Sequence, residues 1–132
     1  MDLEILNIAS DTENNKNIKN HTHHSKLKNS ICGDEVSLEL TIKNNKIKDF
    51  GYYGNSCVYC QASLSVLSKI SINHKKDEID KLCDEAKYLF DKNSKFFAKN
   101  WLLLRKIFKK ENISRKDCIL LPFKTLKKIV SK

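Results

Sequence analysis

The stretch V-S-L-E-L-T-I-K-N-N-K-I-K-D-F-G-Y-Y, residues 36–53, predicts two strands joined by a tight turn. Apolar and polar residues alternate through residues 36–42, which is the period of a strand with one buried face. Asn44 and Asn45 follow, and asparagine tolerates the left-handed backbone conformation that a tight hairpin turn requires. Residues 46–53 then give a second, less regular strand. We therefore expect a β-hairpin over residues 36–53.

Helical patterns follow the hairpin. Residues 78–90 place apolar side chains at i, i+3, i+4 and i+7, which is the spacing of an amphipathic helix. Pro122 fits only the first turn of a helix, so the last helix is expected to begin close to it. Further helices are expected over residues 60–70, 95–109 and 119–130, with a short one over residues 3–8. The core-facing stripe of residues 95–109 consists of Phe97, Trp101, Leu104 and Phe108.

The polar stretch before the hairpin, residues 11–30, shows no apolar period, and we interpret it as a loop or a loosely ordered N-terminal arm. It contains His21, His23 and His24; clustered histidines can bind metal, but in such an arm we expect solvated side chains. Strands first and helices afterwards favour an α+β domain, with helices packed on one face of a small antiparallel sheet. A length of 132 residues predicts a single domain over residues 1–132.

The net charge of +9 is unevenly distributed along the chain. Residues 1–91 carry a net charge of −2, and residues 92–132 carry a net charge of +11. Such a basic segment attracts nucleic acid, an anionic membrane or an acidic protein. Only Arg105 and Arg115 among the 25 basic residues are arginine, however, and nucleic-acid recognition relies on the arginine fork. Nucleic-acid binding is therefore the weaker interpretation.

The five cysteines are expected in a reducing environment. No apolar run of about 18 residues is present, so no membrane-spanning helix is predicted. The N-terminal M-D-L-E lacks the basic and apolar regions of a signal peptide, so we expect a cytoplasmic or equivalent location. Cysteines there are metal ligands or reactive thiols rather than disulfide partners, and an odd number cannot pair completely within one chain.

Cys32, Asp34 and Cys57 are expected at one end of the hairpin. Cys32 lies in C-G-D before the first strand, where Gly33 allows unusual backbone angles, and Cys57 lies in G-N-S-C after the second strand. Spacing alone does not bring Cys118 to this end. Three thiolates and a carboxylate suit a tetrahedral zinc ion, and the thiolates also suit an iron–sulfur cluster. A helix N-terminus lowers a thiol pKa, which we expect at Cys57 and Cys118.

The other cysteines have simpler interpretations. Cys57 and Cys60 form C-V-Y-C, a pair found in zinc knuckles and redox sites, but neither a second pair nor a βαβ pattern accompanies it. Cys83 falls on the apolar face of its helix and is expected to be a small buried side chain. His74 stands alone in a predicted loop, so a catalytic triad is not indicated.

Four segments together resemble one known family. They are C-G-D-E-V-S-L-E-L-T-I (32–42), F-G-Y-Y-G-N-S-C (50–57), C-Q-A-S-L-S (60–65) and R-K-D-C-I-L-L (115–121). They follow the order of the IscU/SufU/NifU family of iron–sulfur cluster assembly proteins. The resemblance implies an α+β fold with one exposed site, and its converging ligands would be Cys32, Asp34, Cys57 and Cys118.

Three features resemble the SufU branch of this family. The interval of 61 residues between Cys57 and Cys118 is long, Asp117 stands where the IscU branch has histidine, and Arg115 matches an arginine of the SufU pattern. The resemblance implies that zinc is held by the three cysteines and Asp34. It also implies that Cys118 accepts persulfide sulfur from a cysteine desulfurase and passes it to downstream iron–sulfur assembly proteins.

Two alternatives stay open beside sulfur transfer: an IscU-type scaffold that carries a nascent iron–sulfur cluster, and a structural zinc-binding interaction module. The chain is thus either sulfurtransferase-like or a scaffold that is not an enzyme. It departs from the family pattern at Ser56, where glycine is usual, and at Cys60, where serine is usual. Cys60 would offer a spare ligand or a resolving thiol. The arm also lacks the N-P-R-N stretch of the family.

Overall fold

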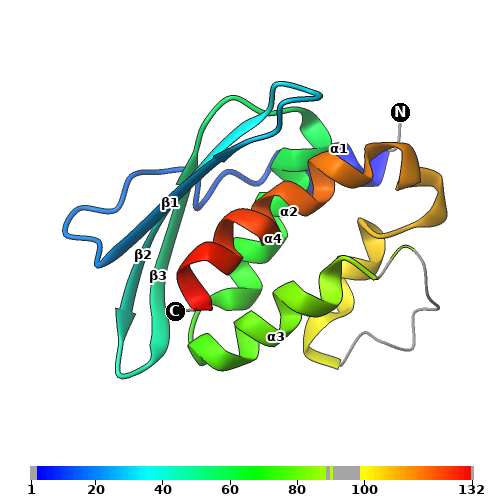
Figure 1. Cartoon of the computed structure of the whole chain (residues 1–132). Helices are drawn as coiled ribbons and strands as arrows, with labels where there is room; N and C mark the ends of the chain where they lie inside the picture. Colours follow the sequence, from blue (N-terminus) through cyan, green and yellow to red (C-terminus); the bar gives the residue numbers. More distant parts are fainter. Residues whose placement is uncertain (1–2, 89, 91–98, 132) are drawn as a thin grey trace.

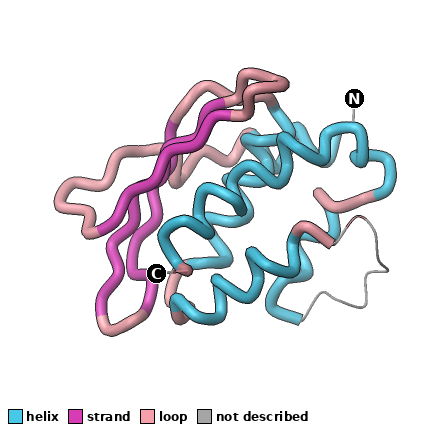
Figure 2. Tube along the Cα trace, in the orientation of Figure 1, coloured by secondary structure: helices cyan, strands magenta, loops and turns pink. Residues whose placement is uncertain are grey.

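A three-stranded antiparallel sheet, in the order β1–β2–β3, carries the helices on one of its faces (Figures 1 and 2). The computed structural model describes residues 3–88, 90 and 99–131. The predicted α+β class is confirmed. The elements are α1 Leu3–Ala9, β1 His23–Lys28, β2 Glu35–Lys43, β3 Lys46–Tyr53, α2 Val58–Ser71, α3 Lys76–Ala86, the 3-10 helices η2 Lys99–Lys106 and η3 Lys110–Arg115, and α4 Lys116–Val130.

The hairpin forms as predicted from the alternating pattern and the asparagine pair. β2 and β3 pair antiparallel, and the φ angles of Asn44 and Asn45 in the turn between them are 53° and 65°. These positive angles are the ones that a tight turn between twisted strands requires. The paired side chains that face the helices are fully buried; they are Leu38 with Tyr52 and Leu40 with Phe50.

The expectation of a loosely ordered arm over residues 11–30 is wrong. β1 forms within it and pairs antiparallel with β2, from His23 opposite Leu40 to Lys28 opposite Glu35. The segment H-H-S-K-L-K carries too few apolar residues to show a strand period. Its conformation is therefore set by pairing with β2 rather than by its own propensity, as is common for strands.

The chain before β1 covers the face of the sheet that points away from the helices. The Tyr52 N–H donates to the Asn14 carbonyl over 3.0 Å, and Ile18 lies against Gly51 with only 7% of its surface exposed. The Ile18 N–H donates to Glu39 Oε1 over 2.8 Å. Because of this cover, Glu39 on the outer face of β2 is buried, whereas the alternating sequence predicted an exposed face.

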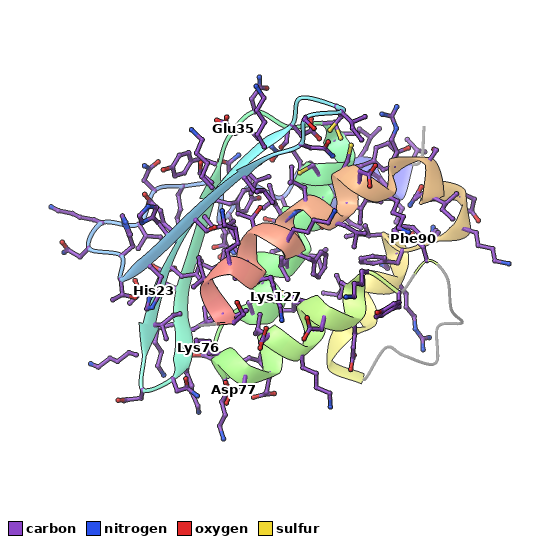
Figure 3. The ribbon with its side chains drawn as sticks, viewed as in Figure 1. His23, Glu35, Lys76, Asp77, Phe90 and Lys127 are labelled. Atoms are coloured by element: carbon purple, nitrogen blue, oxygen red, sulfur yellow. The ribbon has the colours of Figure 1, made fainter. Side chains whose placement is uncertain are left out.

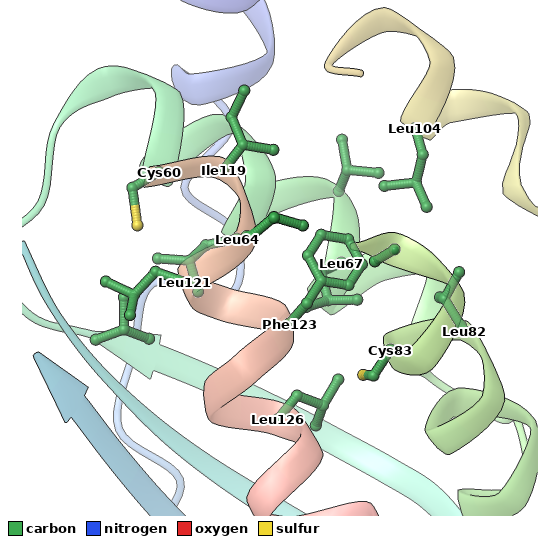
Figure 4. Close-up of a cluster of buried hydrophobic side chains, with 14 of the residues drawn as sticks. Cys60, Leu64, Leu67, Leu82, Cys83, Leu104, Ile119, Leu121, Phe123 and Leu126 are labelled. Carbon is green, nitrogen blue, oxygen red and sulfur yellow. The ribbon is translucent and has the colours of Figure 1, made fainter. Parts of the chain in front are cut away.

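Helix α4 packs on β1 and β2 and also on α2 and α3, so it lies at the centre of the core. Figure 4 shows Leu121, Phe123 and Leu126 of α4 among Leu64 and Leu67 of α2. These residues are all buried, as are most residues of α2. The core therefore joins the helical layer to the sheet through α4.

The start of α4 differs from the prediction. The helix begins at Lys116 and not near residue 119, so Cys118 lies inside its first turn and Pro122 lies in its second. Proline lacks an N–H, and the Cys118 carbonyl therefore loses its usual partner four residues on. The next carbonyl, of Ile119, accepts a hydrogen bond from Ser63 Oγ over 2.7 Å, which ties this turn to α2.

The segment after α2 follows the prediction only in part. α3 ends at Ala86 rather than near residue 90, and Cys83 is buried on it as expected. Of the α-helix expected over residues 95–109, the described part from residue 99 forms the 3-10 helix η2; Leu104 within it and Phe108 after it are buried. Phe97 and the side chain of Trp101 lie outside the described residues. Nothing in the sequence predicted η3.

Several lysines of the basic C-terminal third form ion pairs with acidic residues of other elements. Lys127 of α4 lies 2.5 Å from Asp80 and 2.6 Å from Asp84 of α3, and Lys109 lies 2.6 Å from Glu4. Half-exposed pairs of this kind contribute little to stability, but they orient the helices. Within residues 3–88, 90 and 99–131, none of the helices has the length and apolar character needed to cross a membrane.

Replacing Gly51 with alanine is expected to loosen the arm and to lower the free energy of unfolding by about 1–3 kcal/mol. The new Cβ would lie 2.5 Å from the Lys16 carbonyl oxygen and 2.7 Å from Ile18 Cγ1, so one of these groups must move. Urea unfolding measures the loss, and trypsin cleavage after Lys16 reports release of the arm. Lys48→Ala, at an exposed position of the same strand, is the control. Unchanged stability and cleavage would contradict the packing of the arm.

Candidate metal centre

A closed turn between β1 and β2 presents Cys32 and Asp34. The Asn29 N–H donates to the Asp34 carbonyl over 2.8 Å, and the Gly33 N–H donates to the Asn29 carbonyl over 2.8 Å. Asn29 Oδ1 also accepts the Ile31 N–H over 2.9 Å. Gly33 has φ of +78°, a value that glycine adopts without strain. The turn leaves Cys32 exposed and directs Asp34 into the protein, where it is buried.

The turn after β3 brings Cys57 to the same end of the sheet. Gly54 has φ of +137°, and a Cβ there would lie 2.2 Å from the Glu35 carbonyl oxygen, so only glycine fits this close crossing of β2. The Glu35 N–H donates to the Asn55 carbonyl over 2.8 Å. Cys57 is then the N-cap residue of α2, and its N–H donates to Asp34 Oδ1 over 3.2 Å.

Cys118 joins this end from the first turn of α4. Its sulfur lies 3.7 Å from the sulfur of Cys32, although 86 residues separate the two in the chain. The ligand atoms of Cys32, Asp34 and Cys118 all lie within 4.8 Å of one another, and no other such group of three occurs among the described residues. Cys57 lies beside this group and is not part of it. In Figure 3 the sulfur atoms gather at the end of the sheet near Glu35.

Burial raises the pKa of the Cys118 thiol well above its ordinary value. Hydrogen bonding with the Cys57 and Cys32 thiols raises this pKa further, as does the negative charge of Asp34. The lowered pKa expected from the helix N-terminus is therefore wrong for Cys118. Desolvation and neighbouring acidic groups outweigh the helix dipole here.

Asp34 supplies the test of whether this group suits a cation. Its carboxylate is 7% exposed, and Oδ1 accepts the Cys57 N–H. Oδ2 is buried and has no hydrogen-bond partner in the part of the chain that the structure describes. A buried carboxylate oxygen without a partner is costly, and a divalent cation would satisfy it. Sulfur and carboxylate donors at this spacing fit zinc, which binds both.

Comparison with known proteins decides the family. The family model for the NifU-like N-terminal domain matches residues 3–89, more than half of the chain. The chain belongs to the NifU-like N-terminal domain family. The resemblance to IscU, SufU and NifU proteins noted in the sequence is thereby confirmed.

Individual proteins that are similar to this NifU-like domain agree with the family assignment. The iron–sulfur cluster assembly scaffold protein IscU of Thermotoga maritima is 34% identical over 110 residues, which cover 80% of this chain and 74% of that protein. A crystal structure of a putative SUF-system scaffold protein from Fervidobacterium islandicum is 29% identical, covers 96% of this chain and 93% of that chain, and superposes with a TM-score of 0.83. A NifU-like protein from Brucella abortus has the same fold, with a TM-score of 0.85, 20% identity, and coverage of 96% of this chain and 89% of that chain.

Two residues predicted to support the site, Arg115 and Cys60, lie at the starts of α4 and α2 in the NifU-like domain. The Arg115 guanidinium lies 5.4 Å from the centre of the Tyr59 ring, so it joins the start of α4 to the start of α2. Sequence reasoning missed Tyr59, because a single aromatic residue between two cysteines gives no signal. Cys60 is fully buried, and burial raises its thiol pKa far above the ordinary value, although a hydrogen bond with Ser56 opposes the shift.

Removal of a ligand is expected to weaken zinc binding. We expect Cys32→Ser and Asp34→Asn each to lower the affinity for Zn²⁺ by at least about tenfold, because each removes a donor from the cluster. Competition with a chromophoric chelator measures the affinity. Cys83→Ser and Asp49→Asn, whose side chains lie away from the site, are the matched controls. Equal affinity in all four variants would rule out this centre.

The buried thiol of Cys60 is expected not to be a ligand. Cys60→Ser, which restores the residue usual in the family, should keep the zinc affinity of the wild type within about twofold. The reason is that a fully buried neutral thiol would have to lose a proton and leave the core to bind the ion. The same chelator competition tests this, and a loss as large as that of Cys32→Ser would make Cys60 a fourth sulfur ligand.

Proposed function

We propose that this NifU-like domain is an iron–sulfur cluster assembly protein that accepts sulfur from a cysteine desulfurase, in the manner of SufU proteins. The observation that carries the proposal is the convergence of Cys32 and Asp34, from the turn between β1 and β2, with Cys118 of α4, while Cys57 lies beside them. The names of two relatives support the broad function, since both are called iron–sulfur cluster assembly scaffold proteins IscU. The zinc dependence rests on the donor set.

The resident ion in this proposal is zinc, held by Cys32, Asp34, Cys57 and Cys118. When bound, zinc would keep the thiols deprotonated at neutral pH and sheltered from oxidation. Burial and negatively charged neighbours raise the pKa of Cys118 and favour its protonated form. A bound cation would lower this pKa again by stabilising the thiolate. Asp34 also keeps its Oδ1 on the Cys57 N–H, and a carboxylate oxygen of Asp34 lies within 4.8 Å of the sulfur atoms of Cys32 and Cys118.

Sulfur transfer in this site is a thiol–persulfide exchange. The Cys118 thiolate attacks the terminal sulfur of the persulfide on the desulfurase cysteine. A new S–S bond forms on Cys118, the S–S bond of the donor breaks, and the donor cysteine leaves as a thiolate. No net oxidant or reductant is consumed. Release of Cys118 as a thiolate nucleophile is the condition for this step, because a neutral thiol reacts slowly.

Access to Cys118 is the structural requirement of the reaction. Cys118 is 5% exposed, whereas Cys32 on the neighbouring turn is exposed. A donor persulfide therefore reaches Cys118 when the turn of residues 29–34 moves aside. Cys32 is the thiol that an incoming donor meets first, so mapping of the modified residue distinguishes direct uptake at Cys118 from uptake through Cys32.

A cluster-carrying scaffold is the second candidate, favoured by the thiols of Cys32, Cys57 and Cys118 and by the names of the IscU relatives. In that role iron and sulfide are cargo bound by the same cysteines. Elemental analysis of anaerobically purified protein separates the two roles. About one zinc per chain without sulfide supports sulfur transfer, and matched iron and sulfide support the scaffold.

Cys118→Ser is expected to abolish persulfide uptake while the fold is retained. The protein is incubated with a cysteine desulfurase and cysteine, and the gain of one sulfur atom is mapped by mass spectrometry under non-reducing conditions. The physical reason is that serine keeps the size of the side chain and loses the sulfur nucleophile. Circular dichroism and urea unfolding report the fold.

Cys83→Ser is the matched control, because it removes another buried thiol far from the turn. Sulfur uptake by Cys118→Ser equal to that of this control would refute Cys118 as the acceptor. Unfolding of Cys118→Ser in the presence of zinc would favour the structural zinc module, since structural zinc supplies folding energy directly.

A further inference from the structure

The histidines of the arm do not share one surface. In the strand register His24 lies directly opposite Glu39 of β2, and His23 lies opposite Leu40. Neighbouring residues of a strand point to opposite faces, so His24 shares the outer face of the sheet with Glu39. His21 precedes β1 and lies on this outer face too, with its Nδ1 3.7 Å from Glu39 Oε2. His23 instead contacts Thr22 Oγ1 over 2.8 Å.

The ring of His21 is oriented by two acceptors. Its Nδ1 lies 3.0 Å from the Ile18 carbonyl oxygen, and because a carbonyl can only accept, Nδ1 must carry the hydrogen. The lone pair therefore remains on Nε2, on the opposite side of the ring. Metal-binding histidines commonly use this arrangement, in which one nitrogen donates to a carbonyl or carboxylate and the other binds the ion.

Glu39 makes this orientation rigid. It lies on the central strand, and its side chain is only 10% exposed. Oε1 accepts the Ile18 N–H over 2.8 Å, and Oε2 accepts the Tyr53 hydroxyl over 3.4 Å. The same carboxylate thus fixes the backbone beside His21 and places negative charge behind its ring.

We propose that His21 and His24 form a second metal site, for a divalent late first-row transition ion such as Ni²⁺, Cu²⁺ or Zn²⁺. The two rings lie 6.0 Å apart between centroids, edge to face at 73°. His24 is exposed, so rotation of its ring can turn a nitrogen toward the ion held by His21 Nε2. Imidazole suits these ions, and water completes their coordination. Glu39 acts as a positioning residue.

This site is independent of the thiol centre and of the function proposed for it. β1 rises about 3.4 Å per residue, so His24 and the turn that begins at Asn29 are separated by roughly 17 Å. Figure 3 shows the two places at opposite ends of the sheet, with His23 labelled at one end and Glu35 at the other. The donors also differ, because the thiol centre offers sulfur and the outer face offers nitrogen.

The test is a titration of the full chain, loaded with one equivalent of Zn²⁺, with Ni²⁺. Paramagnetic Ni²⁺ broadens the ring proton signals of nearby histidines in NMR spectra, which locates the ion without relying on total stoichiometry. We expect the His21 and His24 signals to broaden at lower Ni²⁺ than those of His23 and His74. His24→Ala should raise the Ni²⁺ concentration needed to broaden His21 by at least about tenfold.

His23→Ala is the matched control, because it removes an equally exposed histidine from the same strand but from the other face. It should leave the broadening of His21 and His24 unchanged. Equal broadening of all four histidines, or an unchanged response in His24→Ala, would overturn the proposal. Zinc loading and persulfide uptake by the thiol centre are measured separately, so either site can fail without the other.

Discussion

The packing of α4 against both the sheet and α2 is the constraint on which the thiol site depends. Cys118 reaches Cys32 only because the first turn of α4 lies against the start of α2 and beside the turn of residues 29–34. The hydrogen bond from Ser63 to the Ile119 carbonyl fixes that turn one residue from the thiol. Pro122 leaves the Cys118 carbonyl without its helical partner, but the adjacent Ile119 carbonyl is held by Ser63, so the turn keeps its place in the core.

Two opposing effects act on the pKa of the Cys118 thiol, and the larger free energy decides whether the thiol is protonated. A helix N-terminus stabilises a thiolate by about 0.3–1 kcal/mol, and rarely by more than about 2. Burial of an ionisable group shifts its pKa by up to about 3–5 units, and each unit corresponds to about 1.4 kcal/mol. Burial therefore prevails, and the thiol is protonated unless a cation joins the group. A bound cation would oppose this effect, and the unpartnered buried oxygen of Asp34 is a group that a cation would satisfy.

The sequence predicted the structure correctly where a local pattern of residues determines it. The hairpin was predictable because alternation and two asparagines act within a few residues. β1 was not, because H-H-S-K-L-K has no strand period and depends on pairing with residues 35–40. The start of α4 was misplaced because Pro122 was assigned to the first turn, although the segment before it is already helical. The convergence of Cys118 on the site came from family resemblance alone, since no spacing rule connects residues 86 positions apart. The arm histidines are exposed, as expected, but the contact between His21 and the buried Glu39 of the neighbouring strand could not be predicted from the sequence.

Ser56 and Cys60, the two residues near the thiol site that depart from the family pattern, contact each other, and this contact accounts for both substitutions. The family usually has glycine at position 56 and serine at position 60, whereas this chain has Ser56 and Cys60. The Ser56 hydroxyl accepts a hydrogen bond from Gln61 over 2.6 Å and also interacts with the Cys60 thiol. Serine at position 60 would bury its hydroxyl in the core. In this chain the hydroxyl stands at position 56 instead, where the side chain is only partly buried. Sulfur at position 60 then packs as a small apolar group beside Ile119 and Leu121 (Figure 4). Cys60 is better explained by this exchange within the packing than by a fourth reactive thiol.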